Sequence, residues 1–220
     1  YAWHYTGSVF HDIQGPINLM GGKENFVAKL DSVFTVPNTV NVGSYSKMIH
    51  EMTEMVLADM GQYAHGNQPA QHIPYLYAYA GQPWKTQFKV REIMDRLYNA
   101  GPEGFCGDED QGAMSAWYVI SAMGFYAVTP GTDQYVVGSP LFPKMTIYLQ
   151  GGKKLVIEAE HNSSENRYIQ SATLNGKSFT RNYLTYNEIM EGGHLKFQMG
   201  KAANKSRGIH PQDRPFSLSK

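Results

Sequence analysis

Apolar residues recur every three or four positions along the first part of the chain, which is the spacing of amphipathic helices. The stretches that this spacing predicts to be helical are 8–19, 24–34, 45–60, 70–80, 84–98 and 109–123. The period near 3.6 is clearest in the second stretch, at Phe26, Val27, Leu30, Val33 and Phe34. Glycine- and proline-rich loops separate the stretches, so we expect six helices in about three hairpins.

The pattern changes after Gly124. Residues 125–144 are rich in glycine and proline, so we expect a connector without regular elements. Short β-rich runs follow at 144–149, 154–159, 168–174, 178–184 and 194–199. The pair Asn175-Gly176 predicts a hairpin turn between two of them. The sequence therefore predicts a mainly α fold with a β-rich C-terminal part, divided into a helical part (1–124), a connector (125–144), a β-rich region (145–200) and a polar tail (201–220).

Composition narrows the class of protein. The formal net charge is zero, so we expect no nucleic-acid partner held by basic charge. No apolar run is long enough to cross a bilayer, so we expect no membrane span. The single cysteine, Cys106, excludes an internal disulfide framework. Aromatic residues make up 13% of the chain, and their flat apolar faces could bind sugars. Composition alone favours ordinary packing in the core.

An acidic cluster between glycines, Gly-Phe-Cys-Gly-Asp-Glu-Asp-Gln-Gly, occupies residues 104–112. Adjacent carboxylates repel one another, so a stable fold rarely groups them without water, a cation or a hydrogen-bonding partner. Asp108 could cap the helix at 109–123, with Gln111 completing a capping box, but a cap leaves Asp110 unexplained. An EF-hand is excluded because its twelfth position would be Val119. A helix cap, a catalytic base and a calcium ligand stay open.

A second polar segment covers residues 61–69. His65 and His72 are seven positions apart, which is not the spacing of a helical zinc pair. The amide and backbone oxygens around Asn67 and Gln68 suit calcium or sugar hydroxyls better. The plainer interpretation is a turn that leads into a helix.

A third segment, 46–55, places His50 and Glu51 side by side in an apolar helical pattern. Such a pair could recognise vicinal hydroxyls, or it could be a satisfied, partly buried pair. The residues alone favour the second interpretation.

Three motifs taken together resemble glycoside hydrolase family 92. They are H-G-N-Q-P at 65–69, G-D-E-D-Q-G-A-M-S-A-W at 107–117, and the opening A-W-H-Y with the following Phe10-His11-Asp12. The resemblance covers residues 1–149 well and the β-rich end more weakly. That family comprises calcium-dependent, inverting exo-α-mannosidases, in which an N-terminal β-sandwich packs on an (α/α)6 helical barrel. The resemblance implies that our predicted helices are the second half of the barrel, and that the sandwich and first half-barrel belong to a longer chain.

The resemblance also implies roles for site residues. Asp108 and Asp110 match the family's catalytic-base aspartates, with Asp110 as the principal base. Asn67, Gln68 and Asp110 are implied ligands of Ca²⁺, and the same Asn67 and Gln68 are implied to face the substrate.

His50 and Glu51 resemble the family's histidine–glutamate pair, which contacts the leaving-group mannose in α-1,2-specific members. We therefore expect an exo-α-1,2-mannosidase that acts on terminal mannose of N-glycans or mannans, in an extracytoplasmic location. In the family a glutamate general acid is the first residue of the motif E-G-x-A-W-x-Y. Tyr1 of this sequence matches the third position of that motif. The acid would fall just upstream, so we expect the chain alone to be inactive. Two alternatives stay open: a non-catalytic carbohydrate-binding or structural module of the same fold, and a mannosidase for another linkage (α-1,3, α-1,4 or α-1,6).

Overall fold

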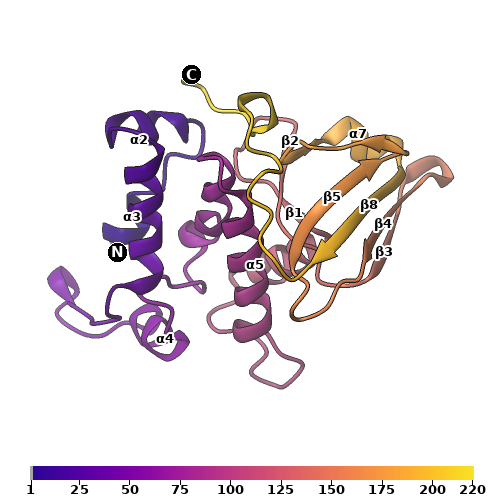
Figure 1. Ribbon diagram of the computed structural model, residues 1–220. Coiled ribbons are helices and arrows are strands. Elements are labelled where there is room, and N and C mark those ends of the chain that lie inside the picture. Colours follow the sequence, from indigo (N-terminus) through magenta and orange to yellow (C-terminus); the bar gives the residue numbers. More distant parts are fainter. Residues whose placement is uncertain (1) are drawn as a thin grey trace.

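The computed structural model describes residues 2–220, and Tyr1, where the general-acid motif would be entered, lies outside them. Helices occupy the first part of the chain and strands the second (Figure 1). The first part contains α1 (Ala2–Tyr5), α2 (Gln14–Leu19), α3 (Lys23–Thr35), α4 (His50–Ala58), α5 (Pro83–Leu97) and α6 (Ala113–Met123). Short 3-10 helices lie between them: η1 (Gly43–Tyr45), η2 (Gln68–Ala70), η3 (Ile73–Ala78) and η4 (Asp110–Gly112). This order confirms the predicted fold class of a mainly α part followed by a β-rich part.

The predicted helix at 70–80 is the 3-10 helix η3, and all of its residues are buried. Its sequence, Ile-Pro-Tyr-Leu-Tyr-Ala, has no polar face, as expected of a helix that the core surrounds. The hydroxyl of Tyr75 donates to Ser121 Oγ at 2.7 Å, and that of Tyr77 donates to Asp31 Oδ1 at 2.9 Å. Through these bonds η3 connects α6 with α3 across the core.

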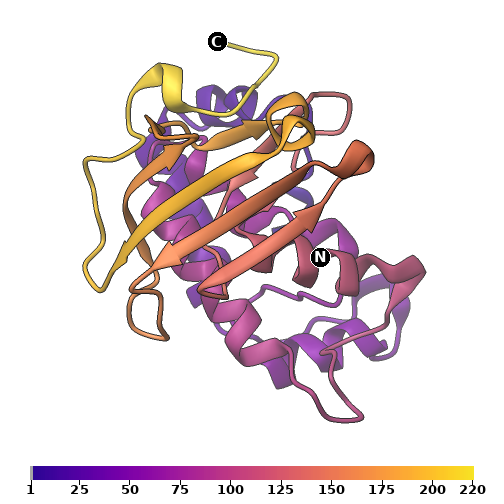
Figure 2. The ribbon, with the colours of Figure 1, turned by 90° about the vertical axis from the view of Figure 1, so that its right-hand side faces the viewer.

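The strands form two sheets (Figure 2). They are β1 (Phe125–Tyr126), β2 (Gln134–Val137), β3 (Lys144–Tyr148), β4 (Lys154–Glu160), β5 (Tyr168–Leu174), β6 (Lys177–Ser178), β7 (Tyr183–Thr185) and β8 (Gly193–Gly200). The larger sheet has the order β3-β4-β8-β5-β6, with β4 parallel to β8 and the other neighbours antiparallel. Alternate residues of β4 and β8 are buried, as the period of a strand requires: Leu155, Ile157, Ala159, Leu195, Phe197 and Met199.

The hairpin predicted at Asn175-Gly176 is confirmed. Leu174 on β5 pairs with Lys177 on β6, and the two residues between them have φ values of 51° and 78°. Positive φ at both central positions is the geometry that Asn-Gly favours in a two-residue hairpin.

Two expectations for the β-rich part are wrong. Residues 125–144 contain strands β1 and β2, which pair with β7 in the smaller sheet of order β1-β2-β7. The single strand predicted at 178–184 is two strands, because the chain leaves the larger sheet after β6 and enters the smaller one at β7. The four-part division of the chain stays a prediction.

Sequence reading also missed α7 (Tyr186–Glu191). The hydroxyl of Thr185 accepts from the Glu188 N–H, and the Glu188 carboxylate accepts from the Thr185 N–H. This reciprocal capping box is a signal that the sequence contained.

The C-terminal residues 201–220 are irregular except for the 3-10 helix η6 (Pro211–Asp213), and they are fastened to the fold. Ser217 Oγ donates to Asp12 Oδ1 at 2.8 Å, and Ser219 Oγ donates to Asp12 Oδ2 at 2.6 Å. These bonds hold the end of the chain beside α2, where Figure 1 shows it. Earlier in the same segment, the side chains of Arg207 and Asp213 are buried. The segment is therefore a strap across the molecule and not a free tail.

Helix α5 joins the helical part to the β-rich part. The Gln87 side chain accepts from the Ile169 N–H at 2.9 Å, and the Arg91 guanidinium donates to the carbonyls of Pro140 and Ser163. Both joining side chains are buried. Among residues 2–220, no helix is both long and apolar enough to cross a membrane.

Candidate active site

Two glycine-containing loops meet beside helix α4, and they are the loops that carry the two polar motifs. A Cβ atom placed on Gly107 would lie 2.7 Å from the Cα of Gly66 and 2.6 Å from Glu54 Oε2. Real Cβ atoms essentially never approach other atoms so closely, so the meeting of the loops requires glycine at both positions. The 61–69 and 104–112 segments, distant in sequence, therefore form one site.

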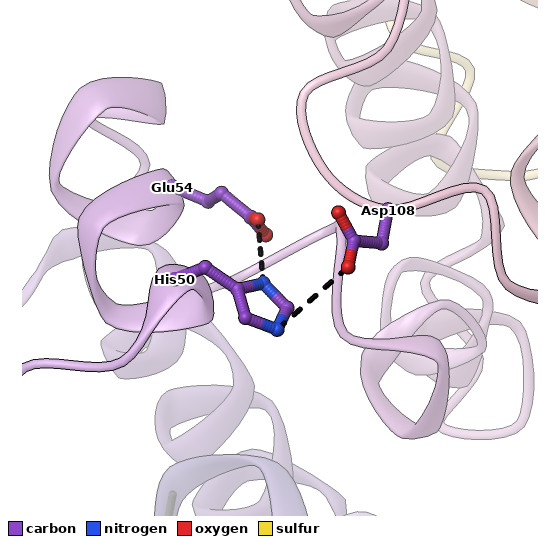
Figure 3. Close-up of side chains that lie close together, drawn as sticks. All are labelled: His50, Glu54 and Asp108. Carbon is purple, nitrogen blue, oxygen red and sulfur yellow. Dashed lines mark hydrogen bonds and ion pairs between the residues drawn. The ribbon is translucent and has the colours of Figure 1, made fainter.

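His50 lies at the start of α4 and faces the acidic loop (Figure 3). Its Nδ1 is 2.9 Å from Glu54 Oε1, and its Nε2 is 3.8 Å from Asp108 Oδ2 and 3.5 Å from Glu51 Oε2. The hydrogen bond with Glu54, followed by the charges of Glu51 and Asp108, holds the pKa of His50 above its ordinary value. With a side chain that is 56% exposed, His50 is a protonatable donor open to solvent.

The structure brings together Gln68 and Asp110, two of the residues that the resemblance implies as calcium ligands. Gln68 Nε2 donates to Asp110 Oδ2 at 3.1 Å and approaches the backbone oxygen of Asp108 at 3.5 Å. Both aspartates are exposed, and Asp110 opens the 3-10 turn η4. The base candidates and the amide candidate therefore share one surface.

Asn67 points its side chain elsewhere. Its Nδ2 lies 3.0 Å from Nδ1 of His4, whose Nε2 is 2.7 Å from the carbonyl oxygen of Gln62. Burial lowers the pKa of His4, so this ring is a neutral support for the loop. His4 belongs to the opening A-W-H-Y motif, which thereby contacts the H-G-N-Q-P motif.

Glu51 lines a small pocket of about 30 Å³, together with Trp3, His4 and Gln62. Its Oε2 is buried and has no hydrogen-bond partner within residues 2–220. The predicted His50–Glu51 pair is thus adjacent, because the Oε2 that has no hydrogen bond is 3.5 Å from His50 Nε2.

His65, the first residue of H-G-N-Q-P, is part of the core. Its Nδ1 lies 2.7 Å from the Tyr63 hydroxyl and its Nε2 lies 2.6 Å from the Tyr98 hydroxyl. Burial lowers the pKa of His65 to about 3, which keeps the ring neutral. Because the Tyr98 hydroxyl donates to the Met114 carbonyl, it accepts from His65 Nε2–H, and Tyr63 donates to Nδ1. This chain of bonds positions the loop and leaves His65 unavailable to a ligand.

The predicted cap of the helix at 109–123 is wrong. Helix α6 begins at Ala113 after Gly112, and no side chain of the N-cap residue bonds to it. Gln111 has φ of +55°, so the predicted capping box cannot form. Glu109 fills the role instead, because its carboxylate accepts from the N–H of Ser115 at 3.0 Å and from its hydroxyl. Asp108 and Asp110 are left free of capping.

Glu54 is the site residue that sequence reading missed. His50, Glu54 and Asp108 each offer an atom to a common point, all within 4.8 Å of one another. The i, i+4 spacing of His50 and Glu54 on α4 was the available signal. The site thus has two donor sets: the nitrogen-containing set of His50, Glu54 and Asp108, and the oxygens of Gln68 and Asp110. Calcium prefers oxygen ligands, so the second set fits calcium and the first fits a transition metal better.

Comparison with known proteins identifies relatives among the glycosidases. The model of the glycosyl hydrolase family 92 catalytic domain matches residues 1–201. The chain is 56% identical to the solved structure of a family GH92 inverting mannosidase from Bacteroides thetaiotaomicron, with a TM-score of 0.86, covering 99% of this chain and 30% of that one. It is 36% identical to a family GH92 alpha-mannosidase from the same organism, with a TM-score of 0.89, covering 100% and 28%. It is 31% identical to an uncharacterized secreted glycosidase of Arthroderma benhamiae, covering 98% and 25%. The chain therefore spans between a quarter and a third of the length of these relatives.

Proposed function

The chain belongs to glycosyl hydrolase family 92, and from this premise we propose that it forms part of a calcium-dependent α-mannosidase that releases terminal mannose with inversion. The observation that carries the proposal is the hydrogen bond from Gln68 to Asp110, which joins the H-G-N-Q-P loop to the acidic loop. Two similar solved structures are named as mannosidases, one of them inverting, which supports this choice of reaction.

Asp110 is the general base. An inverting glycosidase needs one carboxylate that takes a proton from the attacking water on the face opposite the leaving group. Asp110 is exposed, its Oδ2 is held by Gln68, and its Oδ1 accepts no hydrogen bond from residues 2–220. That oxygen is oriented and open to a water molecule. Asp108 assists from the adjacent position, where its carboxylate faces His50.

Calcium would be held by Gln68 and Asp110, together with Asn67. His4 engages the amide nitrogen Nδ2 of Asn67, and the Asn67 backbone carbonyl accepts from the Ala70 N–H, so Asn67 would contribute its side-chain oxygen Oδ1. This all-oxygen donor set is the kind that calcium prefers. When bound, the ion would hold two hydroxyls of the terminal mannose and favour distortion of its ring.

His50 and Glu51 are proposed to contact the leaving-group mannose, which makes α-1,2 the first linkage to test. His50 is exposed and tends toward the protonated form, so its ring can donate to a sugar hydroxyl. Glu51 lies beside it, and its buried Oε2 is 3.5 Å from His50 Nε2 and accepts no hydrogen bond from residues 2–220. Terminal mannose of N-glycans or mannans is the proposed substrate. The secreted character given in the name of the Arthroderma relative supports an extracytoplasmic location.

The test is hydrolysis of α-1,2-, α-1,3-, α-1,4- and α-1,6-mannobiose by the full natural protein that carries these residues, with calcium and with EGTA. Calcium-dependent release of mannose, fastest on the α-1,2 substrate, is the expected result. Release on another linkage only would reject the His50–Glu51 assignment and keep the reaction. Calcium-dependent mannose binding without any release would identify a non-catalytic carbohydrate-binding module.

A further inference from the structure

A second cleft lies where the helical part meets the β-rich part, away from the candidate active site. It encloses about 320 Å³, near the lower end of the range for ligand pockets. Its lining comes from α3, η3, α5 and β5, so rigid elements shape it: Asp31, Tyr77, Trp84, Lys85, Phe88 and Tyr168.

Trp84 is the main aromatic surface of this cleft. It stands in the first turn of α5 and is half-buried. Throughout residues 2–220 its indole ring stacks on no other ring, pairs with no cation and donates no hydrogen bond. A half-buried tryptophan normally finds a partner for its N–H. Its apolar face and its donor are therefore both available to a ligand.

Phe88 lies one turn further along α5 and is held in place. The guanidinium of Arg167 sits 5.3 Å from the centre of its ring, and the ammonium of Lys89 sits 5.5 Å from it. Such cation–π contacts fix the ring without filling the cleft. Trp84 and Phe88 thus offer apolar surface at fixed positions.

The polar groups of the cleft are neutralised in pairs. Asp31 accepts from the Lys85 ammonium at 2.5 Å and from the Tyr77 hydroxyl at 2.9 Å. Lys89 pairs with Glu92 at 2.8 Å. Asp31 and Lys85 therefore neutralise each other, and among residues 2–220 no unpaired carboxylate lines the cleft. The Lys85 ammonium still has N–H groups to donate, which suits a neutral molecule rich in hydroxyls.

We propose that this cleft is a second carbohydrate-binding site, which takes a neutral saccharide with its apolar C–H face on Trp84 and its hydroxyls on Asp31 and Lys85. The site is remote from the candidate active site. Trp84 and Leu97 mark the two ends of α5, about 20 Å apart at the rise of an α-helix. Directly after Leu97, Tyr98 pairs with Phe105 of the acidic loop. The cleft can therefore hold a part of a glycan that does not enter the reaction.

The three tryptophans give a site-resolved test, because each has one indole N–H signal in a ¹⁵N-correlated NMR spectrum. Trp3 lines the cavity beside Glu51, Trp84 lines the cleft, and Trp117 is buried with its N–H on the Gln71 carbonyl. The chain is titrated with α-1,2-mannobiose in EGTA, which removes calcium from the candidate active site. We expect the Trp84 signal to move with saturation, while the Trp117 signal stays in place.

Trp84→Ala should weaken the affinity measured by calorimetry about tenfold, or about 1.4 kcal/mol, because it removes the ring on which the saccharide would lie. Asp110→Asn should leave it unchanged, which separates this proposal from the proposed reaction. The milder Trp84→Phe keeps the test valid if the alanine variant unfolds, and it assigns the Trp84 signal.

Three results would overturn the inference. The first is an unmoved Trp84 signal in EGTA. The second is binding that requires calcium and is lost in Asp110→Asn. The third is a shift of the Trp84 signal with indole or an apolar peptide, and no shift with mannobiose or maltose. That result would identify an apolar docking groove.

Discussion

Gly66 and Gly107 lie backbone against backbone, with the carboxylate of Glu54 packed over both. The contact is what turns two loops from different parts of the chain into one site. It allows no Cβ atom at either position, so its effect can be measured by adding one methyl group.

Gly107→Ala should lower the free energy of unfolding by about 1–3 kcal/mol, because the new Cβ overlaps backbone that cannot retreat easily. Urea unfolding checks this expectation. Gly7→Ala is the matched control, since its Cβ would come no nearer than 3.3 Å to a flexible leucine side chain, Leu76. Equal losses in the two variants would mean that the loop contact is not tight.

Asp110→Asn should reduce kcat of the full natural enzyme by about 10²–10⁴-fold, the range for loss of a general base, with little change in stability. Steady-state kinetics on mannobiose measure the loss. The exposed Asp133, whose side chain makes no described contact, supplies the control Asp133→Asn. Normal turnover in Asp110→Asn would assign the base to Asp108 or to another residue.

Calcium should raise the melting temperature of the chain, because a ligand that binds only the folded state stabilises it. The rise should disappear in Gln68→Ala and persist in His50→Ala, if the oxygen set is the calcium site. The opposite outcome would assign the ion to His50, Glu54 and Asp108. Thermal denaturation with calcium, and separately with zinc, distinguishes the two donor sets.

His50 should titrate above its ordinary pKa, and Glu54→Gln should bring the pKa down, because the hydrogen bond to Glu54 is the main cause of the shift. Because the folded state raises this pKa, protonated His50 stabilises the fold fully below about pH 6.5. This contribution is lost as the pH rises through the folded-state pKa. An NMR titration of the His50 ring follows the proton directly. An unchanged pKa in Glu54→Gln would contradict the contact in Figure 3.

The strap at the C-terminus should loosen in Asp12→Ala. The bonds from Ser219, and then from Ser217, lower the pKa of Asp12 to about 2. Because the folded state lowers this pKa, ionised Asp12 stabilises the fold fully above about pH 4. This contribution is lost as the pH falls through about 2. Hydrogen exchange should therefore become faster at residues 217–219 in the variant at neutral pH. The same exchange rates in Asp12→Ala and the parent chain would show that other contacts hold the strap.

Much of the helical part could be read from sequence, because a helix that covers a core shows a period of 3.6, as at Phe26, Leu30 and Val33. The short strands β1 and β2 could not, since their pairing with β7 depends on residues far along the chain. In the site, the Gln68–Asp110 neighbourhood was predicted, and the residue that caps α6 was not. Capping depends on backbone angles, and the positive φ of Gln111 moved the role to Glu109. Glu54 was missed because only the folded loops cover its carboxylate.

The bond from the Ser219 amide to Asp12 spans 207 positions of sequence. During synthesis on a ribosome, the segment around Asp12 emerges before Ser217 and Ser219, and it gains these partners only after the intervening segment has been made. Formation of the bond therefore requires synthesis through Ser219, and a chain that stops before this residue leaves the Asp12 carboxylate without these partners. The strap therefore sets the order in which these two segments can join, as well as holding them side by side.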